Sequence, residues 1–145
     1  MRNLQLLLKD NYLSMIKNSQ GTKIFRDFFV KIKNKKINLT GKGKHSCALF
    51  VSSILYHFNL IQSPHLTVDG TIKDMRKSGW LEIQRLKTGA VLLWSKQKGH
   101  YHLGFYLGKE RATSNDRKKR VPQIHHITFK NKRRVKAIFW HYKLN

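Results

Sequence analysis

Apolar residues recur at every third or fourth position in the segment KHSCALFVSSILYHF, residues 44–58. This spacing predicts an amphipathic helix that begins at residue 47 and ends near residue 59, with an apolar side made of Cys47, Phe50, Val51, Ile54, Leu55 and Phe58. Ser46 precedes this helix and belongs to a residue type that caps helix N-termini. The helix therefore begins with Cys47, the single cysteine of the chain.

The same periodicity predicts helices elsewhere in the first half of the chain. Residues 3–17 place Leu4, Leu7, Leu8 and Tyr12 on one side of a helix. TVDGTIKDMRKSGW, residues 67–80, predicts a shorter helix that ends at Gly79, and Pro64 marks a loop before it. TKIFRDFFVKIKN, residues 22–34, fits either a helix or a strand.

From residue 89 onwards, short segments rich in β-branched and aromatic residues predict strands, namely 89–95, 100–108, 111–115, 125–129 and 135–142. LGKE, residues 107–110, predicts a tight turn between two of them. Helices followed by strands favour an α+β fold, with helices packed on one face of an antiparallel sheet of about five strands. The length indicates a single domain, 1–145, made of an N-terminal helical or irregular part (1–43), the cysteine helix region (44–80) and the sheet (88–142).

The charge of the chain is strongly positive. Thirty Lys and Arg residues against seven Asp and Glu give a formal net charge of +23. Such a field attracts polyanions, either nucleic acid, anionic lipid headgroups or acidic cell-wall polymers. The basic residues concentrate in KIKNKKINLTGKGK, DRKKR and KNKRRVK. The alternative is that lysine is simply the default surface residue of this protein.

Neither a signal peptide nor a membrane-spanning segment of about 20 apolar residues is found in the sequence. We therefore expect a soluble protein that is cytoplasmic by default, with export by another route left open. A single cysteine excludes both an internal disulfide and a C-x-x-C zinc site.

The predicted strand HYHLGFYLG places His102, Gly104 and Tyr106 on one face. A glycine in the middle of a strand indicates that another part of the backbone approaches closely. We expect that the cysteine helix packs over Gly104 and brings Cys47 beside His102. The helix dipole and the imidazole would then lower the pKa of the thiol, as a nucleophile requires. The alternative is that Cys47 is a small buried hydrophobic residue and His102 a structural histidine.

The segments SCALFVSSIL, LKTGAVLLW and HLGFYLG resemble, in this order, the signature blocks of the NlpC-type papain-like cysteine peptidases, to which the CHAP amidases are related. The resemblance spans residues 46–115. It implies a papain-like α+β fold, hydrolysis of amide bonds, often in peptidoglycan peptides, and no metal or cofactor. It also implies that Cys47 is the nucleophile and His102 the general base. Ser46 and Ala90 replace aspartates of the family pattern, neither of which is catalytic, so both catalytic positions are retained.

A papain-like site also needs a third polar residue that orients the imidazole. A two-residue turn at Gly108 and Lys109 would pair Leu107 with Glu110 and place Asn115 opposite His102. A turn of different length would favour Asp116, and the next predicted strand offers His125 or His126. The alternative is that the SND segment only forms a turn.

Other hypotheses remain open at this stage. Zinc could bind His100 and His102, which lie two residues apart on one strand, but no cluster of cysteines or carboxylates completes a site. The same Cys and His pair could transfer an acyl group to an amine instead of water. A non-enzymatic domain that binds nucleic acid or an envelope polyanion fits the charge, although no nucleic-acid-binding motif is present. Trp80, Trp94 and Trp140 are expected in the core.

Overall fold

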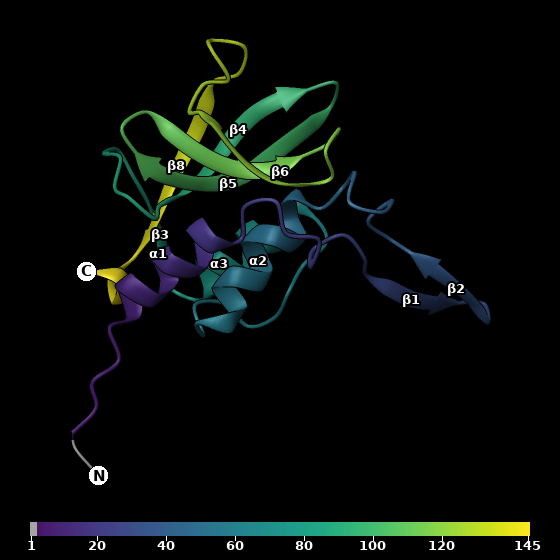
Figure 1. The fold of residues 1–145 in the computed structure, drawn as a ribbon, viewed down its shortest axis with the longest axis horizontal. Helices are drawn as coiled ribbons and strands as arrows, with labels where there is room; N and C mark the ends of the chain where they lie inside the picture. The colour runs from purple at the N-terminus through teal and green to yellow at the C-terminus, as the bar shows by residue number, and fades with distance from the viewer. Residues whose placement is uncertain (1–2) are drawn as a thin grey trace.

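The computed structural model describes residues 3–145, in which three α-helices pack against one side of an antiparallel sheet (Figure 1). The helices are α1 (Leu8–Asn18), α2 (Cys47–His57) and α3 (Val68–Lys77). The sheet has the order β3-β8-β4-β5-β6-β7. Its strands are β3 (Trp80–Ile83), β4 (Val91–Gln97), β5 (His100–Gly108), β6 (Arg111–Asp116), β7 (Val121–His126) and β8 (Val135–His141), and the short helix η1 (Tyr142–Leu144) follows them. The predicted α+β class is confirmed.

This sheet has six strands rather than about five, because the sequence pattern did not reveal β3. A further pair, β1 (Phe29–Ile32) and β2 (Lys35–Asn38), forms a separate two-stranded sheet that projects from the body (Figure 1). The ambiguous segment 22–34 thus contains a strand. Its connecting residues Lys33 and Asn34 both have positive φ, 47° and 64°, as a two-residue type I′ turn requires.

The first helix begins later than predicted. Residues 3–7 are not helical, and Leu4 and Leu7 are 83% and 58% exposed. Leu7 occupies the N-cap position and its side chain offers no hydrogen-bond acceptor. The helix is held instead by Tyr12 and Ile16, which are fully buried. Core contacts rather than a capping residue therefore set its start.

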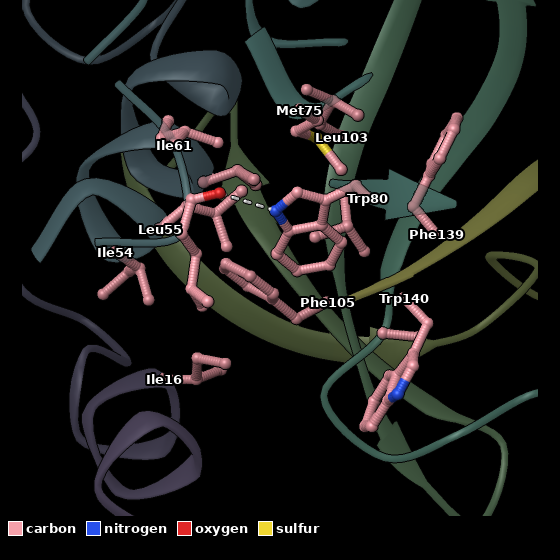
Figure 2. Close-up of a cluster of buried hydrophobic side chains, with 14 of the residues drawn as sticks. Ile16, Ile54, Leu55, Ile61, Met75, Trp80, Leu103, Phe105, Phe139 and Trp140 are labelled. Atoms are coloured by element: carbon pink, nitrogen blue, oxygen red, sulfur yellow. Dashed lines mark hydrogen bonds between the residues drawn. The ribbon is translucent and has the colours of Figure 1, made fainter. Parts of the chain in front are cut away.

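The main core lies between the helices and one face of the sheet (Figure 2). There α2 contributes Phe50, Val51, Ile54 and Leu55, and β5 contributes Leu103 and Phe105. The indole of Trp80 donates a hydrogen bond of 2.8 Å to the Leu60 carbonyl. A smaller cluster on the opposite sheet face contains Leu92, Trp94, Ala112 and Ile127. All three tryptophans are buried, as predicted.

Candidate active site

Cys47 is the first residue of α2 and is half-buried against the sheet. The helix contacts β5 and β6. The thiol lies beside the backbone of Leu103 and of Ala48, and hydrogen bonding from both acts on its pKa. Leu103 follows His102 directly, so the cysteine touches β5 one residue from the predicted base.

The pKa of the Cys47 thiol is raised, not lowered as predicted. Burial is the largest cause, and it outweighs the hydrogen bonds from the backbone and the positive charge of Arg133. Ser46 occupies the N-cap position, but within the described chain its hydroxyl makes no capping hydrogen bond. The backbone N–H groups of the first turn of α2 are therefore not used by a cap.

His102 is half-buried between aromatic rings on the other face of the sheet. Its ring centre lies 5.5 Å from that of Trp94 and 6.1 Å from that of Phe129. Burial, then the charges of Arg133 and His125, lower the pKa of His102 to about 3, although Asp116 acts in the opposite direction. At neutral pH the imidazole is therefore uncharged and can accept a proton, but a pKa this low makes it a weak base in the resting protein.

α2 does not pack over Gly104, so the predicted packing of the helix over this glycine is wrong. A Cβ atom at Gly104 would lie 2.3 Å from the Thr113 carbonyl oxygen, 2.8 Å from the Trp94 ring and 2.9 Å from Ser114. The missing side chain thus makes room for Trp94 and β6. Because side chains alternate along a strand, His102 shares this face and Leu103 shares the helix face. Cys47 meets β5 at its backbone.

No hydrogen bond joins the Cys47 thiol and the His102 imidazole in residues 3–145. The positive charge of Arg133 acts on both groups: it lowers the pKa of the Cys47 thiol and the pKa of the His102 imidazole. Its guanidinium donates to the carbonyls of Ser95, at 2.8 Å, and His100, at 2.6 Å, which fixes it at the start of β5. The residue pattern alone indicated no role for Arg133, because this residue lies in the basic segment KNKRRVK and was counted there only as part of the positive surface charge.

The hairpin register differs from the prediction by one residue. Gly104 pairs with Ser114 and Gly108 pairs with Arg111, so the turn residues are Lys109 and Glu110, and the predicted pairing of Leu107 with Glu110 is wrong. Asn115 is consequently on the helix side. Its amide nitrogen donates 2.8 Å to the carbonyl of Gly43, in the loop that leads to Cys47.

Two of the other candidates for the orienting residue lie within electrostatic reach of His102, namely His125 and Asp116. His125 is held by Ser114 Oγ at 2.7 Å on one ring nitrogen and by the His126 carbonyl at 2.7 Å on the other. One carboxylate oxygen of Asp116 accepts hydrogen bonds from the backbone N–H groups of residues 118 and 119, both at 2.8 Å, which is a turn-forming role. His126 contacts Thr128, away from His102.

Two buried side-chain oxygens of the described chain have no hydrogen-bond partner, and both adjoin the loop before Cys47. They are Ser46 Oγ and Asn115 Oδ1. Unpaired buried polar atoms are costly, and both of these lie near the start of α2, Ser46 at its N-cap and Asn115 through its bond to Gly43.

A cavity of about 280 Å³ opens on the same sheet face as Cys47. Its lining includes Tyr101, two residues before Leu103, and Leu93, the cross-strand partner of Leu103. The cavity lies between α3 and strands β3, β4, β5 and β8, and Cys47 is not among the described residues that line it. A larger groove of about 950 Å³ lies between α1 and the far half of α2, away from the cysteine.

Within residues 3–145, no three His, Cys, Asp or Glu side chains gather as a metal site would require, so the zinc hypothesis has no ligand set. The helices described are all too short or too polar to cross a membrane. Comparison of the sequence with protein-family models gives no match, and comparison with curated proteins gives none either.

Proposed function

We propose that this protein is a small cysteine hydrolase of the papain-like NlpC type that cleaves amide bonds, with cell-wall peptides as one candidate substrate class. The observation that supports it best is the position of Cys47. The single cysteine begins an uncapped helix and lies against β5 one residue from His102, and the charge of Arg133 reaches both groups.

In the proposed mechanism, both groups begin uncharged. His102 takes the thiol proton as Sγ forms a bond to the amide carbon, and it then returns that proton to the leaving nitrogen. Water next attacks the thioester carbon and gives a proton to His102, which passes it to the departing sulfur, so the acid is released and the thiol and neutral imidazole are restored. N–H groups of the first turn of α2, among them that of Ala48 beside the thiol, would stabilise the oxyanion. Because the imidazole lies on the other face of the sheet, this mechanism requires the His102 side chain to move toward Sγ when substrate binds.

The test is labelling of the native protein with a fluorescent peptidyl acyloxymethyl ketone, a probe that reacts with catalytic thiols. We expect labelling of Cys47, lost in Cys47→Ala and slowed about a hundredfold or more in His102→Gln. His57→Gln, at the far end of α2, is the matched control and should label normally. Equal labelling rates for native protein, His102→Gln and urea-unfolded protein would show that Cys47 has no catalytic role.

A second function, binding of a polyanion without catalysis, is favoured by a different observation. The thiol pKa is raised and the imidazole sits between Trp94 and Phe129, as in a structural core. An unreactive Cys47 together with salt-sensitive binding to an anionic polymer would support this alternative.

A further inference from the structure

The β1–β2 hairpin is joined firmly to the body at its base only. Asn38 bonds to Asp27 at 2.5 Å, and Thr40 bonds to the Arg26 carbonyl. The guanidinium of Arg26 in turn donates to the carbonyls of residues 119 and 120 at the β6–β7 turn. Beyond this base the strands extend away from the helices and the main sheet (Figure 1). An isolated hairpin is only marginally stable in water, so this one depends on the contacts at its base.

One face of the hairpin is mainly aliphatic and largely exposed, with Lys35 beside Ile32 near the turn. The register pairs Val30 with Ile37 and Ile32 with Lys35, so the three aliphatic side chains share a face. Ile32 is 47% exposed and Ile37 is 37% exposed. The flanking chain adds Phe28 and Leu39, also exposed. No other segment of the described chain gathers so many exposed large hydrophobic residues.

The hairpin is also purely cationic. Residues 29–38 contain four lysines and no acidic residue. Lys31 lies directly opposite Lys36, an arrangement that destabilises a strand pair through like-charge repulsion. Lys33 occupies the tip, in the turn. A partner that supplies negative charge would relieve this repulsion.

We propose that the β1–β2 hairpin docks the protein on an anionic lipid surface. The aliphatic face would enter the interfacial region, while the lysines would contact the headgroups. Nucleic acid would neutralise the lysines but leave Ile32 and Ile37 in water, and it gains most from aromatic residues that stack on bases. The hairpin has one aromatic residue, Phe29, and the Lys36 ammonium lies over its ring at 4.4 Å. This docking does not depend on the chemistry of Cys47.

The experiment is co-sedimentation with phosphatidylcholine vesicles that contain either no phosphatidylglycerol or about one third of it, at low and high salt. We expect binding only to the anionic vesicles, weakened by salt. The double variant Ile32→Ser, Ile37→Ser should bind at least about tenfold more weakly. The matched control, Leu81→Ser with Ile124→Ser, removes apolar residues that are 70% and 51% exposed on the body and should bind like the native protein.

Lys31→Glu separates loss of docking from loss of structure. It replaces a like-charge pair by an ion pair with Lys36, so thermal stability should be maintained or raised while vesicle binding falls. Unchanged binding in Lys31→Glu, or in the isoleucine double variant, would overturn the proposal. Tighter binding to duplex DNA than to anionic vesicles, insensitive to the isoleucines, would overturn it in favour of nucleic acid.

Discussion

At Cys47, the local backbone and the degree of burial act on the thiol in opposite directions. N–H groups near the start of a helix stabilise a thiolate, and Arg133 adds a positive charge. Removal from water destabilises the thiolate more, and the net pKa is raised. The resting protein therefore holds a protonated thiol on the helix side of β5 and a neutral imidazole on the other face of the sheet, without a contact between them. Proton transfer would have to wait for a substrate that brings them together.

Arg133 gives a direct test of this balance. Because its charge lowers the pKa of Cys47, Arg133→Gln should raise that pKa further. In native protein, the iodoacetamide alkylation rate should rise with pH through a midpoint above the ordinary value of about 8.5. The midpoint of Arg133→Gln should lie higher still.

Arg134→Gln is the control, since Arg134 is the exposed neighbour of Arg133. It should leave the midpoint unchanged. A native midpoint below about pH 8 would mean that the thiolate is already stabilised without substrate.

The start of the cysteine helix could be predicted from the sequence because periodicity and the serine at residue 46 both mark it. The position of Cys47 relative to His102 could not be predicted from the sequence. Alternation assigns His102 and Leu103 to opposite faces, but it does not say which face the helix covers. The ring of Trp94 decides this, since it occupies the space at Gly104. That contact depends on strand register.

Among the elements, β5 was predicted at its observed bounds, whereas β7 was displaced. The sequence favoured residues 125–129, but the strand spans Val121–His126 and includes Pro122. Proline lacks an N–H group and usually interrupts a sheet, yet β7 is an edge strand, where one side needs no partner. The turn between β5 and β6 was also placed one residue too early. Its residues Lys109 and Glu110 adopt positive φ without being glycine, so their residue types did not mark the turn.

The central position of β5 makes Gly104 a sensitive test of the sheet. Gly104→Ala places a methyl group against the Thr113 carbonyl and the Trp94 ring, so we expect a loss of about 3 kcal/mol or more in the free energy of unfolding. Urea titration measures this loss. Gly21→Ala meets no atom within 4 Å and has only the strain of its positive φ, so it should cost about 1 kcal/mol. Equal losses in both variants would contradict the close packing at β5.

For the whole molecule, the excess positive charges that give the net charge of +23 repel one another in the folded state. Added salt screens such repulsion within about 10 Å at 0.1 M. We expect the melting temperature to rise by about 2–6 °C between 10 and 300 mM NaCl. Differential scanning calorimetry measures it.

The rise should be smaller in a variant with Lys118, Lys119, Lys130 and Lys132 changed to Gln, because these exposed residues belong to the basic segments. A melting temperature that falls with salt would instead indicate that attractive ion pairs dominate the surface.

The strand order has a consequence for folding during synthesis on the ribosome. β8 lies between β3 and β4, although it follows both in the chain. Until Val135–His141 has been synthesised, β3 has no neighbour in the sheet and one edge of β4 stays open. At about 5–20 residues per second, this interval lasts several seconds. During this interval the nascent chain exposes the unpaired edge of β4, a surface to which chaperones can bind. The exposure ends when β8 pairs with β3 and β4.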